Sequence, residues 1–146
     1  MTQQQRNLRN VIVVLAAVLV VGSFAVPAFT GYVERSRVAR AVSDIGTVSL
    51  RLHQWQRSGR SLPQTLAEAG ITAVDPWGRP YVYLRAADAR RAQLRKDGEL
   101  VPLNSDFDLY SLGPDGISAL ALPAAPSRDD VVRAANGAFI GVAANY

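Results

Sequence analysis

Three aspartates near the end of the chain have the residue type and the spacing that could bind a cation. Asp115 lies in a Gly-Pro-Asp-Gly turn, and Asp129 and Asp130 follow an intervening loop. If that loop folds back, the three carboxylates meet the carbonyl oxygens of the turn. Calcium prefers hard oxygen ligands of this kind and accepts six to eight of them at about 2.3 to 2.6 Å. The pattern therefore predicts a calcium site.

The same residues also fit an ordinary structural role. Aspartate is frequent in turns, so Asp115 needs no ligand to explain its position. Asp129 and Asp130, together with Ser127, could equally cap the beginning of a short helix. From these residues alone, the metal site and the turn-and-cap arrangement both remain open.

Other residues that carry chemistry are scarce. The chain has one histidine and no cysteine. We expect His53 to be a surface residue on the exposed side of a helix, and Trp77 to be a packing anchor. The charges between residues 86 and 98 are expected to form a solvated face. There is no glycine-rich phosphate loop and no Ser-His-Asp arrangement, so the sequence predicts that the protein is not an enzyme.

A long helix must precede these features. Residues 11–29 form an apolar run of nineteen residues, and no charge occurs between Arg9 and Glu34. At about 1.5 Å per residue, this run matches the roughly 30 Å hydrocarbon core of a bilayer. A cleaved signal peptide is the alternative interpretation. We favour a retained membrane helix because an apolar stripe with helical spacing continues beyond the run: Val38, Ala41, Val42, Ile45, Val48, Leu52 and Trp55.

These patterns predict a membrane segment within residues 1–29 and one globular head over residues 30–146. Arg6 and Arg9 precede the apolar run, which favours a cytoplasmic N-terminus and a head in the periplasm or outside the cell. The head carries fourteen basic and twelve acidic residues. That balance is too even to indicate nucleic-acid binding.

The head is expected to combine the end of the long helix with a small antiparallel sheet, an α+β fold. The helix should end near Gly59, and Pro63 with Gly70 would bound a second, short helix. Alternating apolar residues predict strands over 81–84 and 106–112. Residues 86–98 could form a short helix or a loop, and residues 139–142 a strand or closing layer.

Four segments, in this order along the chain, carry a resemblance to a known family: residues 26–37, 75–81 (Asp-Pro-Trp-Gly-Arg-Pro-Tyr), 108–116 (Asp-Leu-Tyr-Ser-Leu-Gly-Pro-Asp-Gly) and 129–131. With them the chain resembles type IV pilins and the major pseudopilins of type II secretion systems, including the calcium-binding pilins. The resemblance implies a pilin-like fold. It also implies a calcium site formed by the Leu112 carbonyl, the Asp115 side chain, Asp129 or Asp130, and a carbonyl near Ser127. The loop between the two halves of this site is longer here than in the pseudopilin pattern.

The N-terminal motif departs from the family. On an alignment through Pro27, the cleavage-site glycine falls on Gln5, the first mature aromatic residue on Arg6, and the membrane-buried glutamate on Asn10. The chain is then either an uncleaved, membrane-resident relative or a subunit that assembles through another N-terminal contact.

The resemblance implies a structural subunit of a pilus or secretion pseudopilus. Such a subunit associates with itself or with other pilins, and with the assembly machinery of the inner membrane. The finished filament can extend outside the cell. The alternatives are a non-polymerising periplasmic accessory or binding module with a membrane anchor, and a filament subunit for DNA uptake, which would need a clustered basic tip.

Overall fold

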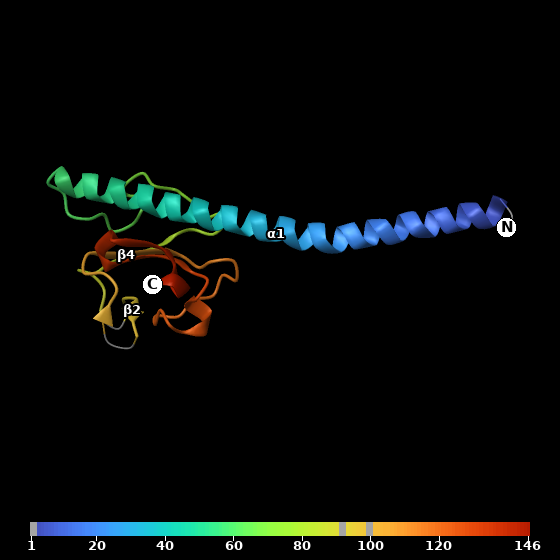
Figure 1. Ribbon diagram of the computed structural model, residues 1–146. Helices are drawn as coiled ribbons and strands as arrows, with labels where there is room; N and C mark the ends of the chain where they lie inside the picture. Colours follow the sequence, from blue (N-terminus) through green and yellow to red (C-terminus); the bar gives the residue numbers. More distant parts are fainter. Residues whose placement is uncertain (1–2, 91–92, 99–100) are drawn as a thin grey trace. The chain divides into compact units, whose positions relative to one another are not determined.

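The computed structural model describes residues 3–90, 93–98 and 101–146 (Figure 1). The chain divides into two compact units, Met1–Ser36 and Arg37–Tyr146. A single helix, α1, covers Gln3–Arg57 and contributes residues to both units. The predicted continuity of the apolar run with the amphipathic stretch is therefore confirmed.

In the first unit, the large apolar side chains described for the run 11–29 of α1 are exposed. Leu19 is 73% exposed and Phe29 is 68% exposed. The helix is long and apolar enough to cross a membrane, a property that a signal sequence near an N-terminus shares. The one hydroxyl group within the run bonds to the helix itself, since Ser23 Oγ donates to the Val20 carbonyl at 2.7 Å. Such a bond lowers the cost of placing a hydroxyl group in lipid.

In the second unit, the expected apolar stripe of α1 faces the core. Its four buried members are at most 3% exposed: Ala41, Ile45, Val48 and Leu52. They pack with residues from the sheet, among them Phe107, Leu109 and Val131. The α1 helix ends at Arg57, close to the expected stop at Gly59, which has a φ of 81°.

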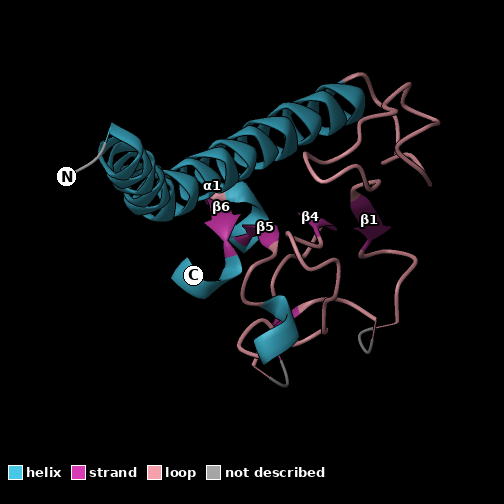
Figure 2. Cartoon of the chain, turned by 90° about the vertical axis from the view of Figure 1, so that its right-hand side faces the viewer, coloured by secondary structure: helices cyan, strands magenta, loops and turns pink. Residues whose placement is uncertain are grey.

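The head contains a four-stranded antiparallel sheet in the order β1-β4-β5-β6 (Figure 2). The strands are β1 (Val82–Arg85), β4 (Phe107–Ser111), β5 (Val131–Ala134) and β6 (Phe139–Val142). In a separate two-stranded sheet, β2 (Lys96–Asp97) pairs antiparallel with β3 (Val101–Pro102). The helix packed on this sheet gives the expected α+β arrangement, which is consistent with a pilin-like fold.

One expectation for secondary structure was wrong, and one strand of the four-stranded sheet was missed. The short helix between Pro63 and Gly70 is a series of turns. A segment of this length cannot hold a helix by itself, and tertiary contacts fix it otherwise, because the Tyr83 hydroxyl donates to the Pro63 carbonyl at 2.9 Å. Strand β5 was not predicted, because Val131–Ala134 is buried at every position and has no alternating pattern.

Candidate functional site

The loop between β4 and β5 brings two of the predicted ligand residues together. Asp129 Oδ2 accepts a hydrogen bond from the Asp115 backbone N–H at 3.3 Å. Asp115 Oδ1 accepts from the N–H of Ile117 at 2.8 Å. Gly113 permits this approach, since its φ is 64° and a Cβ there would lie 2.4 Å from the Asp129 carbonyl oxygen.

Leu112 and Ser127 hold the backbone on either side of this contact. The Leu112 carbonyl accepts the Gly116 N–H at 3.2 Å. Ser127 is buried, and its hydroxyl both accepts from the Ala119 N–H at 3.0 Å and donates to the Ala119 carbonyl at 2.9 Å. The Ser127 carbonyl accepts the Asp130 N–H at 3.2 Å. Both residues therefore shape the loop through bonds within it.

Asp130 points away from the other two carboxylates. It is fully buried, and its Oδ2 lies 2.7 Å from Arg95 Nη1 and accepts the Ser118 hydroxyl at 2.6 Å. Burial raises the pKa of this carboxyl, although Ser118 and Arg95 oppose the shift. Of the two adjacent aspartates, only Asp129 faces Asp115, while a guanidinium group neutralises Asp130.

Within residues 3–90, 93–98 and 101–146, no three histidine, cysteine, aspartate or glutamate side chains are close enough to hold a metal ion. The Asp115 and Asp129 carboxylates could supply two sides of a calcium site. Backbone carbonyls and water would have to complete the six to eight oxygens that calcium accepts.

A second, partly buried ion pair joins Arg133 of β5 to Asp106, the residue before β4. Arg133 donates to both carboxylate oxygens of Asp106, at 2.8 and 2.7 Å, and its guanidinium carbon lies 4.0 Å from the Phe107 ring centroid. Burial opposes ionisation of Asp106, but the hydrogen bonds from Arg133 and from the Phe107 N–H outweigh it and lower its pKa. This geometry favours the ionised pair.

Asp108 connects the two ion pairs through Asn104, whose Nδ2 also donates to the Arg133 carbonyl at 2.9 Å. It is buried, its Oδ2 accepts the Arg95 backbone N–H at 2.7 Å, and its Oδ1 accepts Asn104 Nδ2 at 3.0 Å. Arg95 is 2% exposed. These interior charges were not predicted, and the expectation that the charges of residues 86–98 are solvated was wrong for Arg95. Its long side chain is drawn inward by Asp130 and by the face of Tyr110, 4.3 Å away.

Two of the segments that carry the family resemblance meet in the structure. Asp75 Oδ2 accepts the Ser111 hydroxyl at 2.6 Å, which ties the Asp-Pro-Trp-Gly turn to the end of β4. Arg79 donates to the Gly113 carbonyl, and a Cβ on Gly116 would lie 2.9 Å from Arg79 Nη1. The turn at residues 75–80 therefore supports the loop that carries Asp115.

His53 and Trp77 have structural environments. Trp77 is half-buried against the main core cluster, as expected for a packing anchor. The expectation that His53 lies on the exposed side of α1 was wrong, since it is half-buried and its ring lies 5.9 Å from the Phe107 ring. His53 directly follows the buried Leu52, and this places it at the edge of the packed stripe.

Comparisons with protein-family models, with curated protein sequences and with solved structures give no match to this chain.

Proposed function

We propose that this chain is a membrane-anchored structural subunit of a type IV pilus or of a type II secretion pseudopilus. One observation carries the proposal: the large apolar side chains described for the run 11–29 of α1 are exposed, while the second half of α1 is packed into the core of the head. A helix of this kind presents one long apolar surface to lipid or to other copies of itself. The contacts between the segments that resemble pilins, such as Asp75 with Ser111, add support.

In this proposal, the subunit resides in the inner membrane before assembly, with its head in the periplasm. Assembly exchanges lipid around the apolar half of α1 for the same half of neighbouring subunits, while the heads make lateral contacts. Arg6 and Arg9 remain on the cytoplasmic side until the helix leaves the bilayer. A reporter enzyme fused after Tyr146 should therefore be active only outside the cytoplasm.

A calcium ion bound by Asp115 and Asp129 belongs to the same proposal. The contact between Asp129 Oδ2 and the Asp115 backbone N–H supports it, because it brings both aspartates to one loop, where their carboxylates and nearby carbonyl oxygens can surround a cation. When bound, the ion would neutralise this pair and crosslink the two ends of the loop between β4 and β5. Asp130 takes no part, since Arg95 already neutralises it.

The function is tested by shearing filaments from cells that express the full chain. We expect the chain in the high-molecular-weight sheared fraction, and Val18→Asp in the apolar run should abolish its recovery there. Val101→Asp is the matched control, because Val101 is equally exposed but lies in the head (62% and 63%). A chain found only as a membrane-bound monomer would contradict filament assembly.

The second candidate is a membrane-anchored accessory module of the periplasm that does not polymerise. Gln5, Arg6 and Asn10 favour it, because they occupy the family's processing and assembly positions without the usual residues. The N-terminal residue of the mature protein separates the two candidates. A processed N-terminus together with recovery in the sheared fraction supports the filament, whereas an intact Met1 with no filament supports the accessory module.

A further inference from the structure

The outward face of α1 in the head has a particular composition. Between Arg37 and Arg57, the exposed positions recur every three or four residues and are mainly small or polar: Ala39, Ser43, Thr47 and Gln54. Leu50 is the one large apolar side chain among them and is 54% exposed. The surrounding charge is basic, with four arginines (Arg37, Arg40, Arg51 and Arg57) and one aspartate, Asp44.

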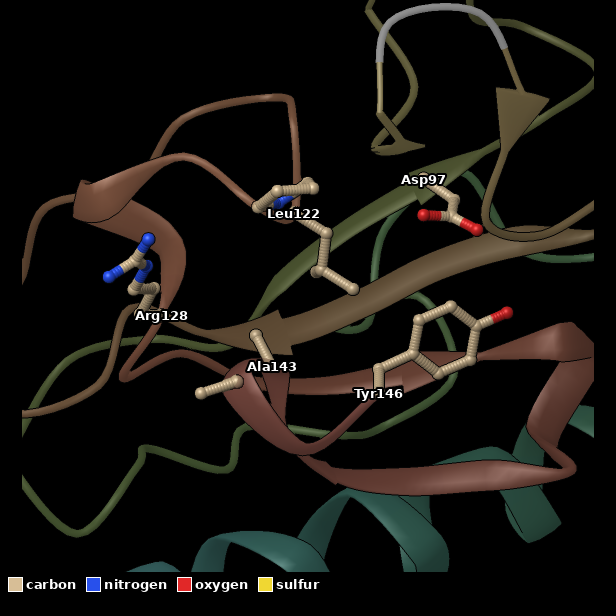
Figure 3. A pocket seen from close by; sticks show the side chains of 7 residues that line it. Asp97, Leu122, Arg128, Ala143 and Tyr146 are labelled. Carbon is tan, nitrogen blue, oxygen red and sulfur yellow. The ribbon is translucent and has the colours of Figure 1, made fainter.

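A hollow elsewhere on the head has complementary properties (Figure 3). Its apolar lining includes Leu122, Pro123 and Ala143. Asp97 and Tyr146 lie on one side of the hollow, and Arg128 lies on the other. The loop that forms part of its wall has no charged residue between Asp115 and Arg128, and it exposes Ile117 and Leu120 by 59% and 44%.

We propose that the hollow is an interaction site for a second copy of this chain, which inserts Leu50 into it and places Arg51 against Asp97. Shape and polarity argue for this occupant, because a lone exposed leucine matches a small apolar hollow. The charges agree, since the basic face around Leu50 meets the Asp97 side of the hollow. Arg128 orients the contact, because a copy turned the other way would bring arginine against arginine.

This contact rests on the proposed filament function, and its geometry suits that function. The two patches differ, so the contact is heterologous and each copy keeps one free patch of each kind. A heterologous contact that does not close into a ring continues into a helical array. The heads would then specify the lateral register of the filament, while the apolar halves of α1 supply its core.

The test uses disulfide crosslinking in the full chain, which has no cysteine of its own. Gln54→Cys places a thiol one helical turn from Leu50, and Ala144→Cys places another in the lining of the hollow. Two differently tagged copies, each with one of these substitutions, are expressed together and oxidised in intact membranes. We expect a mixed disulfide dimer, and a ladder of higher oligomers from the doubly substituted chain.

Matched variants identify the residues responsible. Gln54→Cys combined with Ser105→Cys, which is exposed outside the hollow, should give no crosslink above background. Leu50→Asp should reduce the yield of the Gln54–Ala144 crosslink by more than about tenfold, since burying an unpaired carboxylate is unfavourable. Arg51→Glu or Asp97→Lys alone should reduce it by about fivefold, and the double reversal should restore it.

The contact is wrong if Leu50→Asp leaves the yield of the crosslink unchanged. It is also wrong if the doubly substituted chain forms crosslinked dimers but no higher oligomers. If the chain is recovered as sheared filaments but the crosslink is absent, this contact is wrong and the filament function stands. If both are absent, both proposals are rejected.

Discussion

Asp129 and Asp130 are adjacent in the chain, yet they lie in opposite environments. Asp129 is partly exposed and faces Asp115 at the rim of the loop between β4 and β5. Asp130 is fully buried and forms an ion pair with Arg95. Burial, and not residue type, therefore separates a carboxylate that is available to a metal ion from one that stabilises the fold.

The largest expected effect comes from breaking the buried pair. Asp130→Ala leaves the Arg95 charge buried without its partner, which typically costs about 3 to 5 kcal/mol. Asp129→Ala is the matched control and should cost less than about 1 kcal/mol, because that side chain is partly exposed. The measurement is chemical unfolding of the full chain in detergent micelles. Equal losses for the two aspartates would contradict the comparison.

The double variant Arg95→Met, Asp130→Leu tests whether the unpaired charge causes this loss of stability. If the cost of Asp130→Ala comes from the unpaired charge, removing both charges should recover most of the lost stability. If the double variant is as unstable as the single one, Arg95 contributes mainly through packing, for example on Tyr110.

A somewhat smaller effect is expected from the apolar side of the same core. Ile45→Ala and Leu52→Ala each remove a side chain that is 0% exposed, and such truncations typically cost about 2 to 5 kcal/mol. Both variants should melt at clearly lower temperature than the parent. The half-buried His53 provides the comparison, and His53→Ala should have a smaller effect. Three equal shifts would mean that the packed face of α1 is assigned wrongly.

The calcium proposal tests the exposed side of the comparison. Calcium at a hundredfold excess over its dissociation constant would stabilise the head by about 2.7 kcal/mol. Melting temperature should rise with calcium relative to chelator, and magnesium should substitute poorly because it requires near-octahedral geometry. Asp115→Ala and Asp129→Ala should abolish the response, and Asp130→Asn should preserve it. If calcium does not change the melting temperature of the parent protein, the calcium site does not exist.

The smallest expected effect is on the pH dependence of stability. The pKa of Asp106 is lowered in the fold, so its ion pair adds stability above the ordinary value of 3.8 that is lost as pH falls through the lowered value. The pKa values of Asp108 and Asp130 are raised by burial, so their ionisation removes stability as pH rises above 3.8.

Free energies of unfolding measured from pH 3 to 7 separate these opposite trends. Asp106→Asn should reduce the loss of stability at acidic pH. Asp108→Asn should reduce the loss of stability that occurs as the pH rises above 3.8. If Asp106→Asn leaves the loss of stability at acidic pH unchanged, the ion pair of Asp106 with Arg133 does not cause that loss.

How far the sequence could predict this protein depends on the kind of pattern involved. The stripe containing Ile45 and Leu52 was readable because a helix repeats every 3.6 residues, and the strands around Tyr83 and Leu109 were readable from their composition and turn signals. Asp115 and Asp129 could be suspected of meeting, because a turn and a loop bounded them. Neither Arg95 nor Arg133 could be recognised as buried, since a charged residue in a sequence normally indicates a solvated position.

The long helix, the apolar length of its first half and the α+β composition of the head follow from local periodicity and hydrophobicity, so they could be inferred from the amino-acid sequence. The folded chain was needed to show which of two adjacent aspartates faces Asp115, and that Arg95 reaches Asp130 from 35 residues away. Such pairings depend on contacts between segments that are distant in the chain. Burial then strengthens each interaction that is satisfied and makes an unsatisfied one costly.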